Sequence, residues 1–162
     1  MRYLFTLFLY LCSAWSMAED RANTGVLAII IPANETVNSF KLTPEKLKLI
    51  YLRKQLYWPN GKRIQPVNLQ TEHPLRKQFS QVILGSLPAE QISYWNGLYF
   101  NGIRPPYVVN SEEAALRYVT QTEHAIAYVD ACHVDERVRV VLWIGRNETS
   151  TNTPEGLSCD NP

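Results

Sequence analysis

The chain has 162 residues, with 16 lysines and arginines against 15 aspartates and glutamates, and a formal net charge of +1. This length favours a single domain. The near-neutral balance gives no support to a general role on nucleic acid or on a charged membrane surface, so we expect no nucleic-acid partner.

Residues 1–18 have the pattern of a cleavable signal peptide. Arg2 provides a basic start, residues 3–15 are almost wholly apolar, and Ser16 and Ala18 place small residues around a cleavage site. A membrane anchor is the competing interpretation, but the apolar run is shorter than the roughly 20 residues that a spanning helix needs. We therefore expect an exported protein, periplasmic or secreted, that is not embedded in the membrane.

Strands and helices are predicted to alternate along the rest of the chain. The expected strands are 25–31, 64–69, 124–130 and 138–144, and the expected helices begin at Pro44, Pro74, Pro88 and Glu112. The first strand is a continuous apolar run, which is typical of a strand covered on both faces. This alternation favours an α/β fold with a mixed, mostly parallel sheet flanked by helices. We expect one domain at residues 19–146, followed by a polar, mobile tail at 147–162.

Positive charge is concentrated in residues 41–77, which hold nine basic and two acidic residues. Such a concentration is either a solvated helix face or a surface for an anion or a partner. The turn before Pro74 also places backbone N–H groups at a helix start, where anions bind in many proteins. The candidate ligand-binding residues are Thr71, His73 and Arg76 at this turn, with Thr43 at the start of the preceding helix. Helix capping by the two threonines is the alternative.

Two cysteines remain if the signal peptide is removed, Cys132 and Cys159. In an oxidising compartment they are candidates for a disulfide that holds the polar tail. Cys12 could also suggest a lipoprotein, but Leu11 stands where such sites prefer a small residue. A metal site built on Cys132 with the nearby histidines, His124 and His133, fits no standard ligand spacing. We expect no metal and no cofactor.

Two stretches of the chain resemble the solute-binding proteins of phosphate ABC transporters. The first is LTPEKLKLIYLRKQLYWPNGKRIQPVN, and the second is YWNGLYFNGIRPPYVVNSEEAALRYVTQTEHAIAYVD. In the second stretch, Ala127 replaces a glycine that is usual in the family. The resemblance covers most of the chain after residue 25. It implies an α/β lobe of the periplasmic-binding-protein type, and phosphate or another small anion as the ligand.

The sequence departs from this family in two ways. Family members have two lobes that enclose the ligand between them, and a chain of this length has room for one. The family also binds phosphate through an arginine and a serine-glycine-threonine run at the helix start. By position, Leu69 replaces the arginine, and His73, Pro74 and Leu75 replace the run. The resemblance therefore implies a phosphate-binding scaffold whose anion contacts are largely replaced, with affinity of roughly millimolar.

An enzyme is not expected, because no serine or cysteine has a histidine and an acid in a recognisable motif. The preferred interpretation is a single-lobe extracytoplasmic binding protein for phosphate or another small anion. The alternative is an interaction module that accompanies an envelope sensor or transporter. Six rings could supply its contacts, although most of them are expected in the core: Tyr57, Trp58, Tyr94, Trp95, Tyr99 and Tyr107.

Overall fold

The computed structural model describes residues 25–35, 41–145, 149–150, 152–154, 157 and 159. The predicted signal peptide at residues 1–18 lies outside these residues, as does most of the predicted tail at 147–162. Within the described part of the chain, no helix combines the length and the apolar character that crossing a bilayer requires. The domain bounds at residues 19 and 146 stay predictions.

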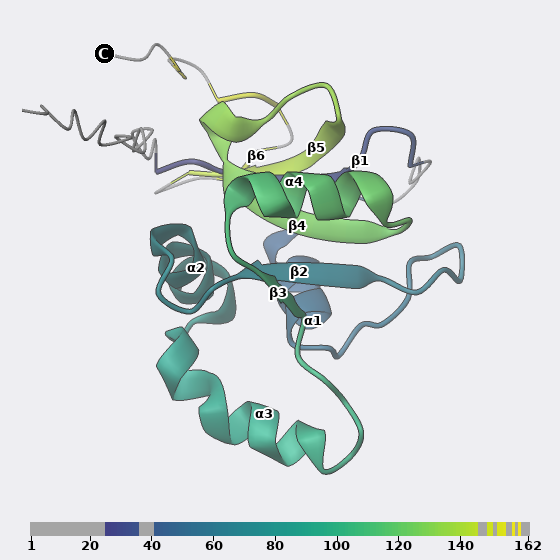
Figure 1. Cartoon of the computed structure of the whole chain (residues 1–162), viewed down its shortest axis with the longest axis vertical. Coiled ribbons are helices and arrows are strands. Elements are labelled where there is room, and N and C mark those ends of the chain that lie inside the picture. Colours follow the sequence, from purple (N-terminus) through teal and green to yellow (C-terminus); the bar gives the residue numbers. More distant parts are fainter. Residues whose placement is uncertain are drawn as a thin grey trace, which may run out of the picture.

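A mixed six-stranded sheet lies at the centre of the described residues (Figure 1). Its strands are arranged in the order β3-β2-β4-β1-β5-β6. Their bounds are Leu27–Pro32 for β1, Gln65–Leu69 for β2, Tyr107–Val109 for β3, Ala125–Asp130 for β4, Val138–Ile144 for β5 and Thr149–Ser150 for β6. The α/β class and the mixed sheet that the sequence predicted are confirmed, and the predicted strand bounds are correct to within two residues.

The sheet is parallel on one side only. Strand β2 pairs in parallel with β3 and β4, whereas β1 pairs antiparallel with β4 and β5, and β5 pairs antiparallel with β6. Antiparallel pairs therefore outnumber parallel pairs, whereas the sequence predicted a mostly parallel sheet. The reason is that a continuous apolar run reports burial on both faces and not strand direction. All six residues of β1 are buried, as the run predicted.

Helices flank the sheet on both faces. Their bounds are Pro44–Tyr51 for α1, Pro74–Phe79 for α2, Ile92–Tyr99 for α3 and Glu112–Gln121 for α4. Figure 1 shows α4 in front of the sheet and α1, drawn fainter, behind it. The expected helix after Pro74 is divided, because α2 continues into a π-helical turn, Ser80–Leu84. This turn ends at Gly85, whose φ of 77° is a left-handed conformation that glycine adopts without strain.

An aromatic cluster of Tyr51, Phe79 and Tyr128 joins α1, α2 and β4. All three rings are fully buried. The rings of Phe79 and Tyr128 stack with their centroids 4.1 Å apart, and the Tyr51 centroid lies 4.5 Å from that of Phe79. The Tyr51 hydroxyl donates to the carbonyl oxygen of Val67 in β2 at 3.0 Å. One cluster thus packs two helices against β2 and β4.

The segment 88–100, named here the α3 arm, stands apart from this core. It consists of a 3₁₀ turn, Pro88–Gln91, followed by α3, and Figure 1 shows it extending away from the sheet. No residue of α3 is buried, and Phe100 is 88% exposed. The Tyr94 hydroxyl attaches the arm to the end of α1 by donating to the Leu52 carbonyl oxygen at 2.6 Å.

The expectation that most of the six aromatic rings lie in the core is wrong. Only Trp58 is buried among them. Tyr57, Tyr99 and Tyr107 are more than half exposed, and the remaining two rings are intermediate. The helical spacing in 88–100 is correct, but a periodic apolar stripe cannot tell burial within the chain from exposure on an arm.

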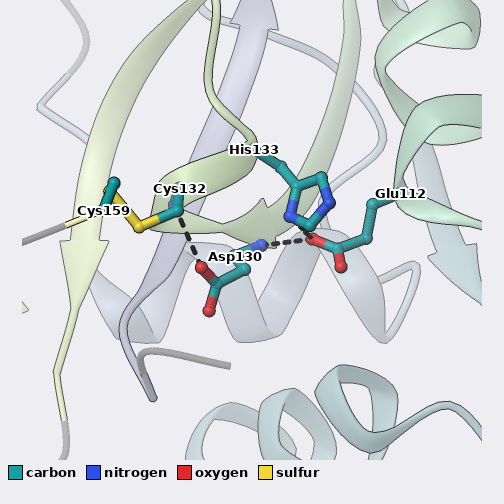
Figure 2. The surroundings of a disulfide bond; sticks show 5 residues. All are labelled: Glu112, Asp130, Cys132, His133 and Cys159. Atoms are coloured by element: carbon teal, nitrogen blue, oxygen red, sulfur yellow. Dashed lines mark hydrogen bonds and ion pairs between the residues drawn. A yellow bond between two sulfur atoms is a disulfide. The ribbon is translucent and has the colours of Figure 1, made fainter. Parts of the chain in front are cut away.

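A disulfide joins Cys132, which follows β4, to Cys159 (Figure 2). The carboxylate of Asp130 accepts a hydrogen bond from the backbone N–H of Cys132 at 3.0 Å. Glu112, at the start of α4, accepts from the backbone N–H of Asp130 at 2.6 Å. Hydrogen bonds therefore connect the disulfide to the first turn of α4.

We predict that replacing both cysteines, as Cys132→Ser with Cys159→Ser, lowers the free energy of unfolding by about 3 kcal/mol. The bond closes a loop with a sequence separation of 27 residues, and its removal frees the unfolded chain from that constraint. Urea denaturation of the oxidised protein and of the double variant measures the difference. Equal midpoints and slopes for the two proteins would contradict the prediction.

Candidate functional site

The turn between β2 and α2 carries three of the four predicted ligand-binding residues. Thr71 lies in this turn with its side chain exposed. His73 is the residue that caps α2, because its Nδ1 atom accepts a hydrogen bond from the backbone N–H of Leu75 at 3.3 Å. The alternative of a threonine cap is therefore wrong for this helix. A ring nitrogen that accepts from the backbone is not available to donate to an anion.

Thr43, the fourth predicted residue, is the cap of α1. Its hydroxyl oxygen accepts from the backbone N–H of Lys46 at 3.3 Å. Capping accounts for its position in the sequence, ahead of Pro44 and Glu45. Thr43 and His73 thus accept hydrogen bonds from helix N–H groups. Neither residue has a described contact with Arg76.

Arg76 points inward from α2 and is only 7% exposed. The positive charge of its guanidinium lowers the pKa values of two buried tyrosines, Tyr51 and Tyr128, but a larger effect raises them. That larger effect is burial, which raises the pKa of both hydroxyls above the ordinary value. The two hydroxyls therefore stay protonated at neutral pH and offer the guanidinium no negative charge.

The polar end of β2 completes the surroundings of this arginine. Asn68 is buried, and its side-chain oxygen accepts from the Tyr128 hydroxyl at 3.2 Å. That hydroxyl in turn accepts from the backbone N–H of Leu69 at 3.2 Å. The hydrogen bonds fix the Tyr128 oxygen at the carboxyl end of β2, which is the end from which the chain turns into α2.

One polar atom of α2 and one of the π-helical turn that follows it lack hydrogen-bond partners. The Nη1 atom of Arg76 and the hydroxyl oxygen of Ser80 are both buried without a hydrogen bond. The two residues are four apart, so they are neighbours on the helix surface. No Asp or Glu of the described chain lies within ion-pair distance of Arg76. A buried guanidinium without a counter-charge is costly, and an anion is the group that would offset that cost.

Sequence reasoning selected Arg76 but missed the buried polar groups around it, Asn68, Ser80 and Tyr128. A signal for one of them exists. Arg76 and Ser80 alternate with Leu75 and Phe79 along the buried face of the helix, where charged and hydroxyl residues are uncommon. The inward direction of Arg76 was not predicted.

Cys132, His124 and His133 each contact another side chain. The sulfur of Cys132 is bonded to Cys159. His133 lies 3.3 Å from the Glu112 carboxylate, and His124 lies 2.9 Å from that of Glu35. No group of three His, Cys, Asp or Glu side chains suited to a metal ion occurs among the described residues.

No protein-family model and no curated protein matches the sequence. Solved structures do match the fold. One is a Clostridium perfringens protein described as a phosphate ABC transporter substrate-binding protein and solved with bound phosphate, with a TM-score of 0.57 and 21% identity. An ABC-type phosphate transport receptor from Vibrio cholerae gives a TM-score of 0.54 and 18% identity. PstS from Borrelia burgdorferi gives a TM-score of 0.54 and 13% identity.

These matches cover much of this chain but only part of each similar protein. They span 74%, 77% and 72% of this chain, and 46%, 52% and 47% of the Clostridium, Vibrio and Borrelia proteins respectively. The chain therefore spans about half the length of the structures it matches. At these identities the comparison establishes the fold alone. The chain adopts the α/β fold of a single lobe of a periplasmic-binding-protein-like receptor.

Proposed function

We propose that this chain is an exported, single-lobe solute-binding domain that binds phosphate or another small oxyanion weakly. The observation that carries the proposal is Arg76, a buried guanidinium without a carboxylate partner at the end of β2. The likeness to a phosphate-bound receptor supports the choice of ligand. The apolar run and small residues of 1–18 support export to the periplasm or the medium.

The expected affinity follows from the number of donors. A charge-assisted hydrogen bond contributes about 1.5–3 kcal/mol, and Arg76 is the buried cation at this junction among the described residues. Thr43 and His73 already serve the helices, so they add little. A site with so few donors, on one side of the anion, should bind phosphate with a Kd of roughly 1 mM, which corresponds to about 4 kcal/mol. The role is binding and not catalysis.

Calorimetric titration with inorganic phosphate tests this proposal. We predict heat with a Kd of roughly 1 mM for the unmodified protein and none for Arg76→Gln, which removes the charge. The matched control is Lys77→Gln, because Lys77 is the neighbouring cation on α2 and its side chain is half exposed and paired with Glu72. Lys77→Gln should bind phosphate as the unmodified protein does.

Because Arg76 is buried, its variant could also disturb the fold. Amide chemical shifts of the unmodified protein provide a second measurement that needs no variant. Phosphate should shift the amide signals of residues 70–73, 75 and 76 and leave those of β5 in place. Saturating shifts elsewhere, or no shifts at all, would contradict the proposal.

A second candidate function is an accessory module that binds an envelope protein through the α3 arm. The observation that favours it is the exposure of Ile92, Tyr99 and Phe100, each at least 60% accessible to solvent. Large apolar side chains gathered on one exposed element are typical of protein interaction sites.

Photo-crosslinking in the native envelope tests this second candidate. A photoreactive residue at Phe100 should give a specific adduct with one envelope protein, and the same residue at exposed Gln121 of α4 should give none. The adduct should decrease when Ile92→Glu is also introduced, because a buried carboxylate weakens an apolar contact. An adduct of equal yield at both positions, or one that contains only a second copy of this chain, would contradict the candidate.

A further inference from the structure

A cavity of about 470 Å³ lies at the opposite end of β2 from Arg76. It is formed where β2 and β3 begin, by Gln65 and Tyr107, and by the segments that precede these strands. Its size is within the range of pockets for small organic molecules. Figure 1 shows that the loop after α3 and the loop after α1, which contribute to it, lie on the same side of the sheet.

The charge of this cavity is strongly positive. Three arginines line it, Arg53, Arg63 and Arg104, and no aspartate or glutamate does. None of the three forms an ion pair with a described side chain. In contrast to these unpaired arginines, Arg117 and Arg137 both form ion pairs with the carboxylate of Glu113 on α4. The cavity therefore concentrates uncompensated positive charge on a chain that is close to neutral overall.

Arg53 is held in this cavity by its backbone and by a hydrogen bond. Its φ of 57° is a left-handed conformation, which costs a residue with a side chain about 1–2 kcal/mol. Its Nη1 atom donates to the Ile64 carbonyl oxygen at 3.4 Å, while its Nε atom is buried without a partner. Burial, and then the charge of Arg63, lower the pKa of the Arg53 guanidinium. A bound anion would offset both effects.

One wall of the cavity is aromatic. The rings of Tyr107 and Tyr118 stack with their centroids 5.0 Å apart, and Tyr107 is 59% exposed. Pro105 and Pro106 stiffen the chain that leads to this wall. A flat, rigid aromatic surface next to clustered guanidinium groups suits a ligand that has both a charged group and a flat apolar body.

We propose that this arginine cavity binds small organic phosphate monoesters, with the phosphate group on the arginines and the organic body against Tyr107. Arginine donors match the oxygens of a phosphate group in pairs, and a monoester carries close to two negative charges above its second pKa of about 6. Inorganic phosphate lacks the organic body and would fill only part of the cavity, so it should give no measurable heat there. The site is separate from the junction at Arg76 and does not depend on phosphate binding there.

Calorimetry with phenyl phosphate as the probe tests the inference, at a pH above the second pKa of the monoester. Arg63→Gln and Arg104→Gln should each weaken binding about tenfold or more, since each removes a charge-assisted contact. Both residues are exposed, so neither replacement disturbs the core. Lys62→Gln is the matched control, because Lys62 is exposed and adjacent to Arg63 but does not line the cavity. This control should bind phenyl phosphate as the unmodified protein does.

Two further measurements test the contributions of the phosphate group and of the organic body separately. Phenol, which lacks the phosphate, should not bind. Tyr107→Ala should weaken the binding of phenyl phosphate and leave the heat that inorganic phosphate gives at Arg76 unchanged. Three results would overturn the inference: no heat with phenyl phosphate, equal losses in the arginine variants and in Lys62→Gln, or equal binding of phenol and phenyl phosphate. The second of these would assign the effect to overall charge and not to a site.

Discussion

The stacking of Phe79 on Tyr128, with Tyr51 against both, is the contact on which the rest of the structure depends. It joins α1 and α2 to β2 and β4, and the two tyrosine hydroxyls form hydrogen bonds with backbone groups of those strands. Because the hydroxyls are buried and remain protonated, the cluster supplies hydrogen bonds without charge. The buried guanidinium of Arg76 therefore lies beside hydroxyl oxygens that neutralise none of its charge.

Much of the fold follows from local patterns in the sequence, and the parts that do not are those set by distant residues. Proline at Pro44 and Pro74 marks two helix starts correctly, and the run of β1 correctly indicates burial on both faces. The direction of β1 is not contained in that run, because it depends on pairing with Tyr128 and Leu142, about one hundred residues further along the chain. The same limit explains the α3 arm, whose spacing predicts a helix but not what covers it.

The candidate sites also combine features that follow from local sequence with features that depend on distant residues. Arg76 was selected because it follows a helix start, yet its direction depends on the cluster beneath it. The choice between Thr71 and His73 as the cap of α2 depends on a shift of two residues, which composition cannot fix. The excess of basic residues in 41–77 does not by itself predict the arginine cavity. Its third arginine, Arg104, comes from a different part of the chain and is brought there only by the fold.

The weak attachment of the α3 arm favours local unfolding of this segment. Left-handed glycines flank it, Gly85 with a φ of 77° and Gly102 with a φ of 74°. With no buried residue in α3, few apolar contacts oppose its separation from the sheet, so its opening costs far less free energy than global unfolding. Backbone amide hydrogens of the arm should therefore exchange with solvent water while those of β1 and β4 remain protected.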